Sequence, residues 1–136
     1  GSCMAGVAFT KGLGLVHSIS HMIGAEYNTQ HGLTNAIILP AVMKFNLPHV
    51  GEKVSFVSSA MDLKDASTDL IVKEIEQILD YVDIPRSLSE IGVPLECKKR
   101  IAKKAMLDSA TGTNPRVAQI KDVEELTEIS ILSARA

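Results

Sequence analysis

The stretch GLGLVHSISHMIG, residues 12–24, decides how the rest of the chain is interpreted. It closes a longer run, residues 3–23, in which small and apolar side chains occupy almost every face of a helix. A helix that is apolar all round is buried, so we expect one buried helix over 3–23 that ends near Gly24. Gly12 and Gly14 lie inside this run and weaken a helix by about 1 kcal/mol each relative to alanine. Glycines at such positions often mark a close approach of the backbone to another helix or to a ligand.

The residues that follow predict a loop over 27–32 and a second helix over 33–46. Pro40 lies in the interior of that helix, where it removes one backbone hydrogen bond and is expected to cause a kink. A short strand over 37–39 is the competing interpretation, because so brief an apolar run does not decide between the two periodicities. A further helix is expected at about 50–61.

The second half of the chain also favours helices. Apolar residues recur at helical spacing over 67–82, with charged residues on the opposite face, which predicts an amphipathic helix. After it we expect a helical turn over 86–91, a helix over 94–109, a loop over 111–116 and a last helix from about Lys121. Six or so helices without convincing strands indicate an all-α fold, and we treat 1–136 as a single helical domain.

The composition excludes several classes of protein. Hydrophobic residues make up 46% of the chain and charged residues 22%, which argues against a disordered tail. The 14 basic residues are balanced by 16 acidic ones, so no nucleic-acid partner is expected. No apolar run approaches 18 residues and nothing resembles a signal peptide, so no membrane partner is expected either. Cys3 and Cys97 form no metal-binding spacing, and we expect both to be reduced in a cytoplasmic protein.

Three of the four histidines gather near the start of the chain. His17 and His21 are four residues apart, so they share one helix face, and His31 lies where the chain could fold back beside them. Imidazole is a common ligand of zinc, iron, copper and nickel. Spacing alone leaves two interpretations open, a metal site and a set of hydrogen-bonded structural histidines. We expect the fourth histidine, His49, to be a surface residue.

Two familiar motifs are absent. The segment HSISH lacks the glutamate that serves as general base in zinc proteases, and Gly12-Leu13-Gly14 follows no strand and lacks the third glycine of a dinucleotide-binding loop.

Taken together, several motifs resemble the iron-containing alcohol dehydrogenase family. They are GLGLVHSISHMIG at 12–24, HGLTNAIILP at 31–40, IPRSL at 84–88, IGV at 91–93, Asp108 and TNPR at 113–116. They occur in the order of the family and span nearly the whole chain. The resemblance implies an all-α helical bundle like the C-terminal domain of the dehydroquinate synthase-like and iron-containing alcohol dehydrogenase fold.

The resemblance also implies roles for the three histidines. His17 and His31 match two ligands of the family's metal, Fe²⁺ with Zn²⁺ as the alternative. His21 matches a histidine close to the nicotinamide and the reacting alcohol, so it is both the catalytic and the cofactor-binding candidate. The implied activity is hydride transfer between an alcohol or aldehyde and NAD or NADP.

The family's two other metal ligands, an aspartate and a histidine, come from helices upstream of this segment, and its nucleotide-binding domain lies further upstream. We expect these parts to be absent from the 136 residues and the chain alone to lack dehydrogenase activity. Val7, Leu15 and Ile19 would then lose their covering helices and form an exposed apolar patch, which predicts a homo-oligomer. Two alternatives stay open: a short non-catalytic helical module for binding or assembly, and a plain helical bundle with structural histidines.

Overall fold

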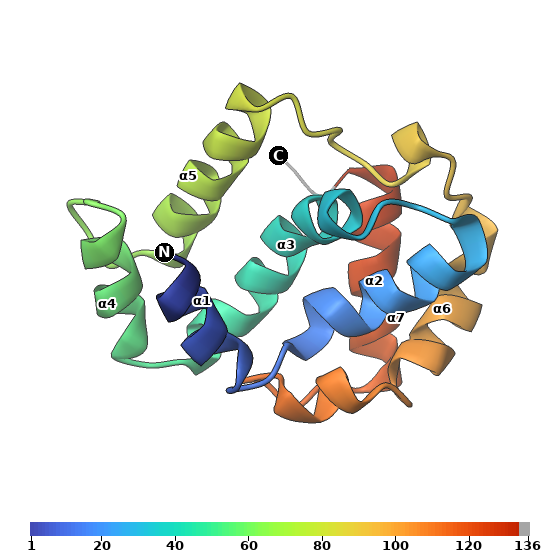
Figure 1. Ribbon diagram of the computed structural model, residues 1–136, viewed down its shortest axis with the longest axis horizontal. Helices are drawn as coiled ribbons and strands as arrows, with labels where there is room; N and C mark the ends of the chain where they lie inside the picture. Colours follow the sequence, from blue (N-terminus) through green and yellow to red (C-terminus); the bar gives the residue numbers. More distant parts are fainter. Residues whose placement is uncertain (134–136) are drawn as a thin grey trace.

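Helices make up the regular structure of residues 1–133, the part of the chain that the computed structural model describes (Figure 1). No strand occurs in this part, which confirms the predicted all-α fold. The α-helices are α1 (Ser2–Phe9), α2 (Gly14–Tyr27), α3 (His31–Asn46), α4 (Lys53–Ala60), α5 (Thr68–Tyr81), α6 (Lys98–Ala105) and α7 (Ile120–Leu132). Four short 3₁₀ helices connect them: η1 (Leu47–His49), η2 (Ser89–Ile91), η3 (Leu95–Cys97) and η4 (Ser109–Thr113).

The single helix predicted over 3–23 is wrong, because the chain breaks between α1 and α2. Gly12 and Gly14 have φ angles of 98° and 71°, which lie in the left-handed region that glycine adopts without strain. A Cβ on Gly12 would overlap the Thr113 side chain, and one on Gly14 would lie 3.0 Å from Asn114 Oδ1. The glycines therefore mark a close approach, as predicted, but the approach ends one helix and starts another.

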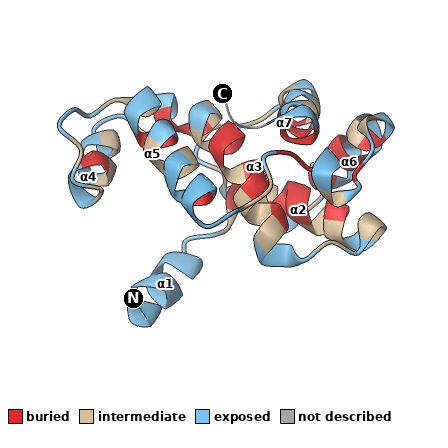
Figure 2. Cartoon of the chain, turned by 90° about the horizontal axis from the view of Figure 1, so that it is seen from above, coloured by how far each residue is buried: buried red, intermediate tan, exposed pale blue. Residues whose placement is uncertain are grey.

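Helix α1 projects from the body of the molecule and is exposed along its whole length (Figure 2). Val7 is accordingly 59% exposed, as expected. The same expectation was wrong for Leu15 and Ile19, which are fully buried. Both lie on α2, and α3 and α6 of this chain cover that helix.

Helices α2 and α3 form a hairpin around a short turn. Helix α2 continues past the predicted stop at Gly24 to Tyr27, and Asn28, whose φ of 51° is left-handed, caps its C-terminal end. His31 was expected in a loop but is the first residue of α3, where the Gln30 side chain accepts a hydrogen bond from the Leu33 N–H. Helix α3 runs through Pro40 to Asn46, so the alternative of a strand over 37–39 is wrong.

The main core lies among α2, α3, α6 and α7. Leu15, Ile19, Ile37, Ile38, Ile101 and Val123 are among its fully buried side chains. A second, smaller core of Leu47, Ile71 and Val72 joins α5 to the end of α3. The predicted helices over 50–61 and 67–82 correspond to α4 and α5. The helix predicted over 94–109 is shorter: it is α6, preceded by η3, and η4 occupies part of the predicted loop over 111–116.

Asn114 fixes the start of α2 against the end of α3. Its Oδ1 accepts hydrogen bonds from the Leu15 N–H at 3.1 Å and from Asn46 Nδ2 at 2.9 Å. Its Nδ2 donates to Asn46 Oδ1 and to the Arg116 carbonyl, both at 2.7 Å. Because Leu15 lies two residues before His17, this network sets the position of the first histidine.

Glu26 connects the other end of α2 to α6. Its carboxylate accepts hydrogen bonds from Arg100 Nη2 at 2.8 Å and from Lys104 Nζ at 2.7 Å. Hydrogen bonds from Arg100 and Lys104 hold the pKa of Glu26 below its ordinary value of 4.5. Helix α2 is therefore fixed at both ends, so the segment between them presents its side chains from a defined position.

Both cysteines are free thiols: Cys3 is exposed and Cys97 is buried. Across residues 1–133, no helix has the length and hydropathy needed to cross a membrane.

Candidate metal centre

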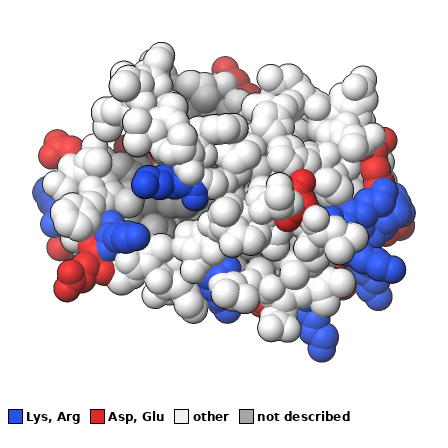
Figure 3. Space-filling model, turned by 60° about the horizontal axis from the view of Figure 1, so that its bottom comes forward, with Lys and Arg blue, Asp and Glu red and all other residues white. Residues whose placement is uncertain are grey.

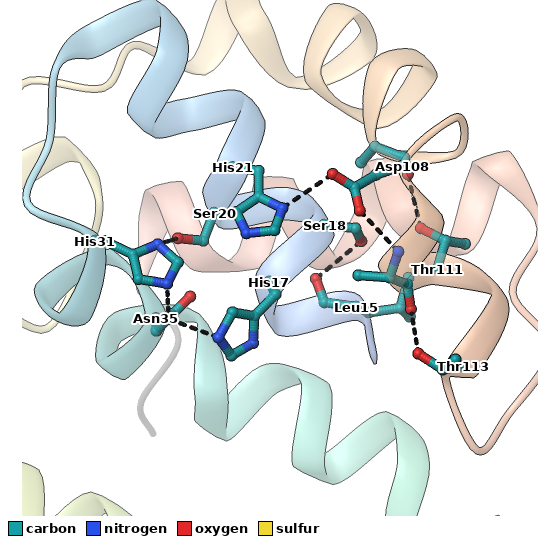
Figure 4. Close-up of polar contacts among 12 residues, drawn as sticks. Leu15, His17, Ser18, Ser20, His21, His31, Asn35, Asp108, Thr111 and Thr113 are labelled. Atoms are coloured by element: carbon teal, nitrogen blue, oxygen red, sulfur yellow. Dashed lines mark hydrogen bonds and ion pairs between the residues drawn. The ribbon is translucent and has the colours of Figure 1, made fainter. Parts of the chain in front are cut away.

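The three histidines of the first third of the chain lie together at the α2–α3 hairpin (Figure 4). His17 and His21 project from α2 and His31 from the first position of α3. The centroids of the His17 and His31 rings are 5.2 Å apart, and the His21 ring lies 5.8 Å from His17 and 5.6 Å from His31. Spacing of four on one helix and a short turn before the next helix bring these rings together.

The Nε2 atoms of His17 and His31 approach the same point, which the Asn35 amide occupies. Asn35 Nδ2 lies 3.3 Å from His17 Nε2 and 3.0 Å from His31 Nε2. Asn35 is four residues after His31, so both project from the same face of α3. An amide NH₂ has two protons and imidazole Nε2 has one lone pair, so this nitrogen can donate to both rings. Asn35 Nδ2 thus lies between the Nε2 lone pairs of the two rings, and a cation at this position could bind both lone pairs.

His17 is the more enclosed of the two rings. Burial, followed by the neighbouring His31 and His21 rings, lowers the pKa of His17. Its Nδ1 is buried and has no hydrogen-bond partner of normal geometry. The nearby Leu13 backbone raises the pKa of His17, but this effect is smaller than the effects that lower it. These surroundings favour the neutral ring, which is the form that binds metals.

His31 lies at the exposed side of the cluster. Its Nδ1 is 3.4 Å from the hydroxyl of Ser20, a residue that is itself almost fully buried. This contact fixes one nitrogen of the ring and leaves Nε2 directed at Asn35. A metal ligand commonly has such a partner on its second nitrogen, since it fixes the orientation of the ring.

His21 contacts a residue to which the sequence assigned no role. Its Nδ1 lies 2.9 Å from Asp108 Oδ2, and Asp108 Oδ1 accepts the Ala110 N–H at 2.8 Å (Figure 4). Burial alone would raise the pKa of Asp108, but the Ala110 N–H and the His21 ring outweigh it, and the net shift is downward. Asp108 is 87 positions from His21, so no local pattern could have paired the two residues.

The described residues supply an incomplete ligand set. Within 1–133, no group of three or more histidine, cysteine, aspartate or glutamate side chains is arranged to hold a metal ion. Metal–imidazole bonds of about 2.0–2.1 Å are shorter than the 3.3 and 3.0 Å contacts of these two rings with Asn35 Nδ2, so a metal at that point would require both Nε2 atoms to lie closer to it. His17 and His31 could each supply one nitrogen ligand to a single metal ion, and further ligands are needed to complete its coordination. His49 is exposed, as predicted, and contributes nothing to this cluster.

Comparison with known proteins identifies the family. Residues 1–131 match the family model described as Fe-containing alcohol dehydrogenase family, C-terminal. The chain is 38% identical over 133 residues to lactaldehyde reductase of Escherichia coli K12, covering 93% of this chain and 35% of that protein. It is 39% identical over 135 residues to the NAD-dependent methanol dehydrogenase of Bacillus methanolicus, covering 90% and 34% of the two chains.

Solved structures show the same similarity. A 1,3-propanediol oxidoreductase aligns with a TM-score of 0.81 at 27% identity, over 88% of this chain and 33% of that one. An alcohol dehydrogenase from Oenococcus oeni aligns with the same TM-score at 28% identity, over 87% and 32% of the two chains. The chain spans about a third of the length of these relatives. It belongs to the iron-containing alcohol dehydrogenase family and corresponds to its C-terminal part.

Proposed function

We propose that this chain supplies half of the metal ligands and part of the reaction space of an alcohol dehydrogenase that uses NAD or NADP. The observation that carries the proposal is the approach of His17 and His31 Nε2 to one point at Asn35. Relatives named lactaldehyde reductase and NAD-dependent methanol dehydrogenase support a small alcohol or aldehyde as the substrate. The use of a soluble nicotinamide cofactor favours the cytoplasm as its location.

In this proposal His17 and His31 bind Fe²⁺, with Zn²⁺ as the alternative, and two further ligands come from the part of the enzyme outside this chain. When bound, the metal would supply Lewis acidity toward the alcohol oxygen, and NAD(P) would supply the redox chemistry. The neutral state favoured for His17 and the Ser20 contact that orients His31 both suit ligation. His21 would lie beside the substrate and accept the proton that the alcohol loses.

Metal binding by the purified chain tests the role of the two ligands. Two imidazoles without a carboxylate should prefer Cu²⁺, Ni²⁺ or Zn²⁺ to Fe²⁺, so Ni²⁺ is a suitable probe for calorimetric titration. Mutation of a residue that hydrogen-bonds to a metal ligand typically weakens metal binding by roughly 10–100-fold. His17→Ala and His31→Ala remove a ligand itself, so we expect each to weaken Ni²⁺ binding by more than this. His49→Ala is the matched control and should leave binding unchanged. Equal affinities of all three variants and the wild type would refute the site.

We also propose that the chain by itself has no dehydrogenase activity, because it carries two of the four ligands and spans about a third of the length of its relatives. Oxidation of simple alcohols by the purified chain with NAD(P) at an ordinary enzymatic rate would contradict this expectation.

Exposed apolar side chains support a homo-oligomer. Phe9 and Phe56 are 66% and 74% exposed. Uncharged residues cover most of the face shown in Figure 3, with a few charged side chains among them. Association would remove such side chains from water. Light scattering at high concentration is the measurement, and a uniform monomer would count against this assembly.

A further inference from the structure

The contact between His21 and Asp108 joins α2 to the segment after α6, and it uses both carboxylate oxygens. Oδ2 lies 2.9 Å from His21 Nδ1, while Oδ1 accepts the Ala110 N–H at the start of η4. The Asp108 side chain is only 14% exposed, whereas that of His21 is 37% exposed. A largely buried carboxylate thus holds a ring whose other side is open to its surroundings.

The hydrogen atom in this contact belongs to the imidazole. The Ala110 N–H and the His21 ring hold the pKa of Asp108 below its usual range, although burial opposes them, so Asp108 is ionised at neutral pH. An ionised carboxylate only accepts hydrogen bonds. The 2.9 Å contact therefore requires an N–H on His21 Nδ1.

A neutral imidazole with its proton on Nδ1 has a free lone pair on Nε2. In Figure 4 the Nε2 side of His21 is turned away from Asp108, toward the side of the cluster where His31 and His17 lie. The planes of the His21 and His31 rings differ by only 15°, so the two rings lie nearly parallel. Asp108 thereby determines which nitrogen of His21 faces the space between the three rings and whether that nitrogen carries a proton.

We infer that Asp108 is a positioning residue that keeps the proton of His21 on Nδ1 and leaves Nε2 as the proton acceptor beside His17 and His31. The use of that acceptor in alcohol oxidation rests on the proposed function, but the tautomer itself does not. A carboxylate that orients a histidine and fixes its tautomer in this way is a recurrent arrangement where a histidine acts as a base.

Nitrogen-15 NMR of the histidine side chains tests the inference directly. Spectra of the wild-type chain are recorded without metal, at rising pH until the histidine shifts no longer change, so that they report neutral rings. Protonated and unprotonated ring nitrogens differ widely in chemical shift, so each ring reveals its tautomer. We expect His21 to carry its proton on Nδ1, and a wild-type ring protonated on Nε2 would overturn the inference without any variant.

Two variants separate the contact with His21 from the role of Asp108 as the cap of η4. Asp108→Asn retains an oxygen for Ala110 but presents an NH₂ that donates to Nδ1, so His21 should change to the Nε2-protonated form. Asp108→Ser retains a capping oxygen on a shorter side chain, so the Nδ1-protonated form should fall from nearly the whole population to a mixture. Ser109→Ala, at the exposed neighbouring position, is the control and should leave the tautomer unchanged.

Retention of the Nδ1-protonated form in both Asp108 variants, with helical content unchanged by circular dichroism, would overturn the inference. Failure of the proposed function gives a different result. If Ni²⁺ binding proves independent of His17 and His31 while His21 stays protonated on Nδ1, the metal site is refuted and the role of Asp108 stands.

Discussion

The paired amides of Asn46 and Asn114 offer a sharp test of how α2 is positioned. Asn114 joins three parts of the chain through four hydrogen bonds, to the Leu15 N–H, to both ends of the Asn46 amide and to the Arg116 carbonyl. A typical hydrogen bond contributes about 1 kcal/mol net, and a buried group left without its partner costs roughly 1–3 kcal/mol. Asn46 is only 9% exposed, so water would not readily replace the lost partner.

From these values we expect Asn114→Ala to lower the free energy of unfolding by about 3 kcal/mol, because it leaves the Leu15 N–H and the Asn46 amide without partners. Asn46→Ala should cost about 2 kcal/mol, since it removes only the two hydrogen bonds between the amides. The double variant should cost about 4 kcal/mol, which is about 1 kcal/mol less than the two single effects added together.

Urea unfolding followed by far-ultraviolet circular dichroism measures these quantities, provided that the slope of the transition stays constant among the variants. Gln77→Ala, at an exposed position of α5, serves as the control and should change stability by less than about 0.5 kcal/mol. Additive effects of the two asparagine substitutions, within about 0.3 kcal/mol, would refute the direct pairing of the two side chains.

Three further predictions concern the break before α2, the ion pairs between Glu26 and α6, and the two cysteine thiols. Gly12→Ala should destabilise the chain by several kcal/mol in the same urea assay, because φ is positive and the Cβ has no space, whereas Gly6→Ala in exposed α1 should be neutral or slightly stabilising. The folded-state pKa of Glu26 is depressed, so its ion pairs stabilise the fold above about pH 4.5 and lose that effect as the pH falls through the depressed value. The stability difference between wild type and Glu26→Gln should therefore shrink below pH 4.5, and a difference that grows with acidification would contradict the assignment. Burial raises the pKa of the Cys97 thiol, so a thiol reagent at neutral pH should label Cys3 rapidly and Cys97 only after denaturant is added; equal rates would show that Cys97 is accessible.

The sequence predicted the helices whose signals are local. The amphipathic pattern over 67–82 gave α5 to within about a residue at each end, because its polar and apolar faces repeat at helical spacing. The break between α1 and α2 was not predicted, because apolar residues lie on both sides of the short segment Thr10-Lys11-Gly12. The positive φ angles of Gly12 and Gly14 depend on contacts with Thr113 and Asn114, about 100 residues later in the chain.

The same distinction applies to the candidate site. Spacing placed His17 and His21 on one helix face, and the resemblance to the family added His31 as the partner of His17. Asn35 could have been noticed, since it lies four residues after His31, but only once α3 was known to begin at His31. Asp108 was part of the resemblance but had no assigned role, because its pairing with His21 arises from the packing of α6 and η4 against α2.

The separation of these partners along the chain has a consequence for the order in which the protein folds. His17 and His31 are 14 positions apart on one helical hairpin, whereas Asp108 follows His21 by 87. Closing the longer loop costs roughly 1.5 kcal/mol more chain entropy than closing the shorter one, because the cost grows with the logarithm of loop length. We therefore expect a refolding chain to assemble its three imidazoles first and to exchange both tautomers of His21 freely until the second half of the chain docks.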